Sequence, residues 1–190
     1  MTERRSWIPA KQRLLRAAGE LFYLHGINAV GIASIAERAG VTKKTVYDCY
    51  RSKDDIVVAY LTERHADWLG FLDVRLTADG PTPLAVFDSY IDHLQKGQAL
   101  NGCAFINAAA HLPASHPAMT VVREHKAGVR RRLAELLPAR DATPVQHEAF
   151  VDHLFYLLEG AVVDSGIKHS IYPLIAGRGI AEAVLANSST

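Results

Sequence analysis

The residues best suited to chemistry lie near the amino end, where two short helical patterns flank a glycine. Residues 32–39 repeat apolar side chains at helical spacing, Gly40 follows, and residues 43–49 form a second short helical pattern. Thr42 is an N-cap candidate for the second helix. A glycine in the turn favours a helix-turn-helix, because it takes backbone conformations that are costly for other residues.

The second short helix is predicted to expose polar and basic side chains. Val41 and Val46 can anchor it to a core. A short helix with a basic first turn fits the major groove of duplex DNA, where N-terminal side chains reach base edges. Lysine can donate to the O6 or N7 atoms of guanine. The predicted outer face consists of Lys43, Lys44, Thr45, Tyr47 and Asp48.

Helical periodicity also dominates the rest of the chain, which predicts an all-α fold of about nine helices. No strand pattern of any length, repeat or low-complexity tract is found in the sequence. Glycine, proline and hydroxyl residues punctuate the helical patterns. Besides the two short helices, we expect helices near residues 10–25, from 53 to the break at 79–83, and near residues 83–96, 104–112, 116–137, 144–163 and 173–186.

The charge is divided unevenly along the chain. The net charge of +1 combines ten basic and four acidic residues in positions 1–53 with eleven basic and sixteen acidic residues afterwards. The first part therefore carries +6 and the rest −5. A basic head on an acidic body favours a head that meets a polyanion. We expect a DNA-binding domain at residues 1–53 and a helical effector-binding and dimerisation domain at residues 54–190.

Composition and motif content narrow the classes of protein to which the chain could belong. With 190 residues and 49% hydrophobic content the chain is globular, and its apolar runs are too short to span a bilayer. The charged first residues and two cysteines, Cys49 and Cys103, favour a soluble, reduced, cytoplasmic protein. Ser-His-Asp and Cys-His sets, a phosphate loop and HExxH are missing from the sequence, so we expect neither an enzyme nor a bound cofactor.

Residues 11–60 resemble the TetR family of one-component transcriptional repressors. The body also resembles one branch of this family, through residues 101–110, 116–117 and 123–126. The resemblance over the first four helices is carried by Leu14-Leu15, Ala17-Ala18, Leu21-Phe22, Gly26, Ile35-Ala36, Ala39-Gly40-Val41, Thr45-Val46-Tyr47, Tyr50 and Ser52-Lys53.

The resemblance implies a homodimer that binds a palindromic DNA operator, with one helix-turn-helix on each half-site. Lys43, Lys44 and Thr45 would face base edges, while Tyr47 and Lys53 would hold phosphates. An N-terminal arm with basic side chains could follow the backbone or enter the minor groove. The predicted DNA-binding set is therefore Thr42, Lys43, Lys44, Thr45, Tyr47, Lys53, Arg4 and Arg5.

Five positions depart from the family pattern, among them Tyr50, which replaces the usual phenylalanine. Val30 and Gly31 replace hydroxyl residues that cap a helix and touch phosphate, and Cys49 replaces a histidine. Asp48 places a negative charge near DNA, where it could accept from cytosine N4 or lie to one side. The departures keep a second hypothesis open, in which the chain is a helical protein-interaction or ligand-binding module with weakened DNA binding.

The resemblance also implies a small-molecule pocket in the body, with ligand binding shifting the spacing of the two heads. His111 and His153 interrupt apolar helices, so they could bind a metal, bond to a ligand or serve structural roles. Each apolar candidate could equally belong to an ordinary core. The predicted ligand-binding set is Trp68, Leu72, Phe87, Tyr90, Ile91, Phe105, His111, Phe155 and Leu158.

The last two helices carry more apolar side chains than one small domain needs to bury. The family forms its dimer from the corresponding helices, so we expect a homodimer through residues 144–163 and 173–186. Gly160, Gly177 and Gly179 would allow close approach between helices. The competing interpretation is a core within one chain.

Overall fold

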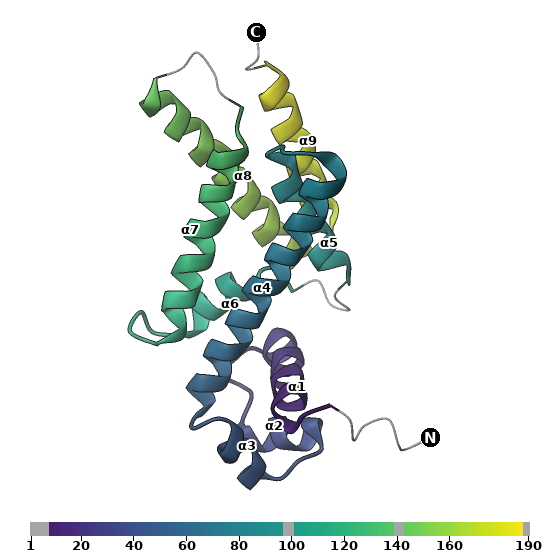
Figure 1. Cartoon of the computed structure of the whole chain (residues 1–190), viewed down its shortest axis with the longest axis vertical. Coiled ribbons are helices and arrows are strands. Elements are labelled where there is room, and N and C mark those ends of the chain that lie inside the picture. Colours follow the sequence, from purple (N-terminus) through teal and green to yellow (C-terminus); the bar gives the residue numbers. More distant parts are fainter. Residues whose placement is uncertain (1–7, 97–100, 139–142, 188–190) are drawn as a thin grey trace. The chain divides into compact units, whose positions relative to one another are not determined.

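The computed structural model describes residues 8–96, 101–138 and 143–187, and over these ranges it contains nine α-helices and no strand (Figure 1). The all-α prediction is confirmed. Each helix falls close to its predicted position, and the two short helices begin and end where expected. The elements are α1 (Ala10–His25), α2 (Ile32–Ala39), α3 (Lys43–Cys49), α4 (Lys53–Asp79), α5 (Leu84–Lys96), α6 (Ala104–His111), α7 (Ala118–Leu136), α8 (Pro144–Lys168) and α9 (Tyr172–Asn187).

By its internal contacts the chain divides into two compact units. The first unit combines residues 1–64 with residues 104–122, and the second combines residues 65–103 with residues 123–190. The division passes through α4 and α7, so each of these helices contributes to both units. The predicted domain boundary at residue 53 rests on charge and motif, and it stays a prediction.

The first unit is built on α1, which packs against α2 and α3. Leu14, Ala18 and Phe22 follow one another at helical spacing and are buried. Pro9 precedes the first turn, where its missing N–H costs no hydrogen bond. Gly26 ends the helix with a positive φ of 81°, a conformation that favours glycine. Local sequence therefore fixes both ends of the helix that supports the helix-turn-helix.

In the second unit α9 packs against both α5 and α8. Helix α8 begins with a capping box, in which Thr143 Oγ1 accepts from Gln146 N and the Gln146 side chain accepts from Thr143 N. The predicted end near Val163 is wrong by one turn and a half, because the helix continues to Lys168. An ion pair of 2.8 Å between Lys168 and Asp164 spans that last turn.

Close packing between α8 and α9 depends on a missing side chain. A Cβ built on Gly177 would lie 2.8 Å from the Cβ of Ala161, closer than two such atoms approach in folded proteins. By contrast, a Cβ built on Gly160 or Gly179 would meet no atom within 4 Å. Of the three glycines predicted to permit close helix approach, Gly177 does so within the chain. Among the described helices, none is long and apolar enough to cross a membrane.

Candidate functional site

The turn between α2 and α3 is held by backbone hydrogen bonds that require a left-handed residue. Gly40 has φ 65° and ψ 45°, where a side chain would be strained. Its N–H donates to Glu37 O at 3.1 Å, and the N–H of Val41 donates to Ala36 O at 3.0 Å. The chain therefore leaves α2 abruptly and enters α3 within three residues.

Helix α3 is capped and anchored as the sequence predicts. Thr42 Oγ1 accepts from Thr45 N at 3.1 Å, and Val46 is completely buried. The Thr45 hydroxyl also lies 2.9 Å from the Thr42 hydroxyl. These two threonines hold the first turn of α3 together, so Thr45 is both a predicted base contact and part of the cap.

The predicted contacts to DNA are exposed on this anchored helix. Lys43 and Lys44 project into solvent, and Tyr47 is 56% exposed although it is aromatic. Lys44 Nζ lies 3.1 Å from Asp48 Oδ2. A cluster of exposed donors on a rigidly positioned helix suits the recognition of base edges and phosphates.

A further predicted phosphate contact, Lys53, is the first residue of α4 and is half-buried. The turn before it is ordered by Ser52 Oγ, which accepts from Asp55 N at 3.1 Å. Arg4 and Arg5 lie outside the described residues.

Two departures from the family pattern have visible structural counterparts. Gly31 precedes α2 without a side-chain cap, so the first turn of that helix lacks the hydroxyl that the family uses. Tyr50 is buried after α3, which raises the pKa of its hydroxyl, and Lys11 Nζ lies 5.4 Å from the centre of its ring. Tyr50 therefore serves as a packing residue between α1 and the end of α3.

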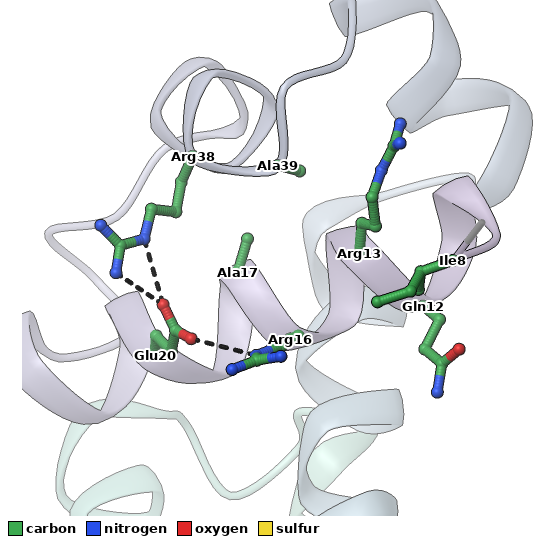
Figure 2. Close-up of a pocket in the computed structure, with 8 residues that line it drawn as sticks. All are labelled: Ile8, Gln12, Arg13, Arg16, Ala17, Glu20, Arg38 and Ala39. Atoms are coloured by element: carbon green, nitrogen blue, oxygen red, sulfur yellow. Dashed lines mark hydrogen bonds and ion pairs between the residues drawn. The ribbon is translucent and has the colours of Figure 1, made fainter. Parts of the chain in front are cut away.

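A surface cavity of about 430 Å³ lies beside α1 and α2 in the first unit. Figure 2 shows Arg16 and Arg38 converging on Glu20, whereas Arg13 points elsewhere. Arg38 reaches Glu20 Oε2 at 2.7 Å, and Arg16 reaches Glu20 Oε1 at 3.3 Å. The lining consists of Ile8, Gln12, Arg13, Arg16, Ala17, Glu20, Arg38 and Ala39.

The ion pairs of Glu20 indicate that the residues lining this cavity have a structural role. Hydrogen bonding and charge attraction from Arg38 lower the pKa of Glu20, against a smaller opposing effect of burial. Since Glu20 already occupies two of the guanidinium groups, the ion pairs tie α1 to α2. We assign these residues to the support of the helix-turn-helix.

In the second unit, a chain of three polar side chains lies in an apolar interior. His125 is only 1% exposed; its Nδ1 lies 3.0 Å from His65 Nδ1, and its Nε2 lies 3.0 Å from the Tyr90 hydroxyl. Either tautomer of neutral His125 satisfies both contacts, since it can accept from Tyr90 and donate to His65 or donate to Tyr90 and accept from His65. Helices α4, α5 and α7 each contribute one member of this buried polar cluster.

Aromatic packing surrounds this cluster. The rings of Trp68 and His125 meet edge to face, with their centroids 5.2 Å apart. The rings of Trp68 and Tyr90 are tilted against each other, with their centroids 5.8 Å apart. The indole Nε1 of Trp68 is buried without a hydrogen-bond partner in the structure. An acceptor on a bound molecule would satisfy that donor.

Burial controls the titration of the cluster. Loss of solvent, with smaller contributions from nearby Lys126, His65 and His93, lowers the pKa of His125 to about 2. Burial also lowers the pKa of His65 and raises that of the Tyr90 hydroxyl. All three side chains are therefore neutral at physiological pH, where they act as hydrogen-bonding groups.

The residue after His125, Lys126, bonds to a carboxylate and a thiol of the second unit. Lys126 Nζ donates to Glu159 Oε1 at 2.7 Å and to Cys103 Sγ at 3.6 Å. The Lys126 and Glu159 side chains are about one-fifth exposed, so this ion pair is shielded from water. It joins α7 to α8.

The structure brings some of the predicted ligand-binding residues together. Tyr90 belongs to the buried polar cluster, and Trp68 packs against its His125 ring. Leu72, Phe87 and Leu158 are buried and Ile91 and Phe155 are half-buried in the same unit.

Phe105 and His111 belong to the first unit. There, Phe105 is buried. Backbone O of His111 accepts from the Asn28 side chain at 3.1 Å, and the imidazole lies against Gly26. In the first unit His111 thus contacts the segment between α1 and α2. Its predicted role in ligand binding stays a prediction.

The sequence interpretation did not single out His65 or His125. A signal for both was available, since each lies on an apolar helical stripe, between Leu61 and Trp68 in α4 and between Val122 and Val129 in α7. A polar residue on a buried stripe needs a partner. Among the residues that the structure describes, no group of three or more His, Cys, Asp or Glu side chains is placed to hold a metal ion.

Known proteins share both the sequence motif and the fold. Residues 14–60 match the family of bacterial regulatory proteins named after tetR. A TetR-family transcriptional regulator from Streptomyces coelicolor has a TM-score of 0.83 and 28% sequence identity, covering 95% of this chain and 96% of that one. The chain thus carries the DNA-binding motif of the TetR family at residues 14–60 and has the fold of that family's regulators. The helix-turn-helix described above falls within the matched residues.

Two further relatives show how far the TetR resemblance extends. The reduced form of NemR from E. coli has the same fold, with a TM-score of 0.74 and 21% identity over 92% of this chain and 96% of that one. FasR of Mycolicibacterium smegmatis, an HTH-type transcriptional activator, is 38% identical over 96 residues. This match covers 46% of the chain and 43% of FasR, so the chain aligns with less than half of that relative.

Proposed function

We propose that this chain binds a palindromic DNA operator as a homodimer and regulates transcription in response to a small molecule. The observation that carries the proposal is the α2–α3 unit, in which Gly40 and Thr42 position a helix with exposed Lys43 and Lys44. A basic, exposed and firmly anchored second helix is what insertion into the major groove requires.

Selection from random-sequence DNA duplexes tests DNA binding and identifies the operator in the same experiment. Recovered sequences should contain two related half-sites, and affinity should fall steeply with salt because bound phosphates release counterions. Lys53→Ala should weaken binding to all sequences and reduce the salt slope by about 1 per half-site. Lys168→Ala, which removes a lysine with a 61% exposed side chain from α8, is the matched control. Failure to enrich any duplex contradicts the proposal.

An exposed apolar stripe supports the homodimer. On α8 the exposed side chains Tyr156, Val163 and Ile167 repeat at helical spacing, and Gly160 lies among them. Tyr172, Ile175 and Gly179 form a similar stripe on α9. We name these seven residues the outer stripe. Apolar surface arranged in this way is typical of a two-fold helical interface.

The buried polar cluster supports an effector site in the second unit. His125, Tyr90 and Trp68 offer neutral hydrogen-bonding groups among aromatic rings, which suits a largely apolar molecule with a few polar atoms. A compound library screened by thermal shift, followed by release of the selected DNA, identifies such a molecule. Tyr90→Phe should weaken its effect, and an unchanged response in His111→Ala would remove His111 from the proposed pocket.

The direction of regulation follows from where the operator lies relative to the promoter. The resemblance implies repression, whereas the relative FasR is an activator. A reporter gene placed behind the selected operator distinguishes the two modes. An increase of expression when the regulator is deleted supports repression, and a decrease supports activation.

The second candidate function is a protein-interaction module with weakened DNA binding. The observation that favours it is the uncapped start of α2 at Gly31, where the resemblance implies that the family's hydroxyl contact to phosphate is missing. The salt dependence separates the two candidates, since a DNA-binding regulator shows a steep slope, whereas an interaction module shows salt-independent or absent duplex binding.

A further inference from the structure

The centre of the exposed face of α3 is occupied by a charge pair. Val46 is fully buried and marks the inner side of the helix. At about 100° per residue, Lys44 and Asp48 each lie about 160° from Val46, on the opposite side. Thr45 and Tyr47 lie on the flanks at about 100°. A helix seated through Val46 thus directs Lys44 and Asp48 outward together.

These two side chains are joined but not locked. Lys44 Nζ lies 3.1 Å from Asp48 Oδ2, and the side chains are 84% and 61% exposed. An exposed ion pair of this spacing on a helix is worth only about a twofold change in an equilibrium constant. Both groups therefore remain available to a ligand, and their mutual attraction keeps a donor next to an acceptor.

A donor and an acceptor about 3 Å apart match the edge of a base pair. In the major groove guanine O6 accepts, while N4 of its cytosine donates. These two atoms are hydrogen-bonded to each other, so they lie about 2.7–3.2 Å apart. The Lys44–Asp48 separation falls in this range. The ammonium can meet O6 while the carboxylate accepts from N4.

A T·A pair presents the same order of acceptor and donor, so the atoms beside them decide between the two pairs. Guanine adds the N7 acceptor next to O6, which gives the Lys44 ammonium a second partner. Thymine instead presents a methyl group there. On the other side, adenine N7 would repel the Asp48 carboxylate, whereas cytosine has no acceptor beside N4. Both the Lys44 ammonium and the Asp48 carboxylate therefore favour a G·C pair over a T·A pair.

We propose that Lys44 and Asp48 act together as the reader of one G·C base pair in each half-site. Lys44 binds O6 and N7 of guanine, and Asp48 accepts from N4 of the paired cytosine. The inference rests on the proposed function, because it assumes that α3 enters the major groove. It makes Asp48 a residue that specifies sequence despite its negative charge.

Selection from random duplexes at one fixed salt concentration, with wild type and variants in parallel, tests the proposal. Wild type should prefer G·C about 5- to 100-fold at one position of each half-site. Asp48→Ala should reduce this preference at that position and leave the others unchanged. Asp48→Asn should move the preference towards A, since an asparagine amide pairs with N6 and N7 of adenine.

Controls separate this reading from a general effect of charge. Glu37→Ala removes an exposed acid from α2 and should leave every base preference as in wild type. Lys44→Ala should relax the same position as Asp48→Ala, because the two side chains read one base pair. Circular dichroism melting checks that the variants fold, which their exposed positions favour.

The outcomes are distinct for the proposed function and for this inference. If wild type enriches no duplex, DNA binding itself is wrong and the inference falls with it. If wild type selects an operator but Asp48→Ala and Asp48→Asn keep its base preferences, the proposed function stands and the paired reading of G·C is overturned. Relaxation of different positions by Lys44→Ala and Asp48→Ala would also overturn it.

Discussion

The two compact units distribute polar and apolar side chains in opposite ways. In the first unit the polar groups assigned to DNA are exposed, as at Lys44, while the apolar Val46 is buried. In the second unit the polar His125 is buried, while the apolar Ile167 is 72% exposed. Exposed cations suit a highly charged, hydrated partner, whereas an exposed apolar stripe and a buried polar cluster suit a second copy of the chain and a small molecule.

The contrast also indicates which property of the protein a substitution in each unit should change. An exposed charge contributes little to stability, because water solvates it in both the folded and the unfolded state. A buried polar group loses that solvation and must be satisfied by the protein. Substitutions of exposed charges in the first unit should therefore change DNA binding more than folding, and substitutions in the buried cluster should change folding.

The largest expected effect comes from charging the outer stripe. Ile167→Glu should prevent dimerisation, because two carboxylates would face each other across an apolar interface. Without the second head, DNA affinity should fall about 100-fold or more. Size-exclusion chromatography with light scattering and a DNA titration measure the two effects.

Val74→Glu is the matched control for the outer stripe, since Val74 is 65% exposed on α4. It should remain a dimer and keep its affinity for DNA. A dimeric Ile167→Glu protein, or a wild type that is monomeric at micromolar concentration, contradicts the proposed interface.

Acid should destabilise the chain through the buried cluster. The pKa of His125 is about 2 in the folded state and about 6.5 when unfolded, so the unfolded chain takes up the proton first as the pH falls. Stability is therefore full above pH 6.5 and declines below it. The free energy of unfolding should be lower at pH 5 than at pH 7 by about 2 kcal/mol from this residue alone. Urea unfolding at the two pH values measures the loss.

His125→Gln removes the titrating group and should reduce this pH dependence, whereas His147→Gln, a half-buried histidine of α8, should preserve it. A direct check that needs no variant is the NMR titration of the His125 ring. If its resonances shift with a midpoint near pH 6.5 in the folded protein, the neutral buried imidazole is wrong.

Removing one hydroxyl from each unit sharpens the contrast at constant side-chain shape. Tyr90→Phe leaves His125 Nε2 without its partner, so unfolding should become easier by about 1–2 kcal/mol. Tyr47→Phe changes an exposed hydroxyl and should alter stability by less than about 0.5 kcal/mol. Denaturant unfolding of both variants decides whether the buried hydroxyl carries the larger effect.

The smallest effect is expected at the ion pairs beside α1. Glu20→Gln weakens the contacts to Arg16 and Arg38, whose side chains are 77% and 58% exposed, so the loss should be about 0.2–1 kcal/mol. Because the pKa of Glu20 is lowered, this contribution is present near neutral pH and disappears as acid protonates the carboxylate. A loss much above this range would mean that the cavity residues form a more cooperative network.

Local signals account for the parts of the fold that were predicted most closely. The bounds of α2 and α3 follow from Gly40 and Thr42, whose conformational and capping preferences act within a few residues. The end of α8 was misplaced because no such signal stands after Val163, and the helix continues through Gly166 to Lys168.

The buried cluster was harder to predict because its members are distant in sequence. His65 and His125 are 60 positions apart, and Tyr90 is 35 positions from His125. Periodicity places each of these residues on an inner helical face, but only the packing of three helices decides which inner residues meet. The same reasoning explains why Trp68 and Tyr90 were predicted as site residues while their histidine partners were missed.

Three of the four glycines of α8 and α9 are under different mutational constraints. Any side chain at Gly177 must push α8 away from α9, so saturation mutagenesis should recover almost only glycine there, whatever property is selected. Space is open within one chain at Gly160 and Gly179, so larger residues there should pass a selection for soluble expression. The same substitutions should fail a selection for gene regulation, which would let a single library distinguish positions needed for folding from positions needed for assembly.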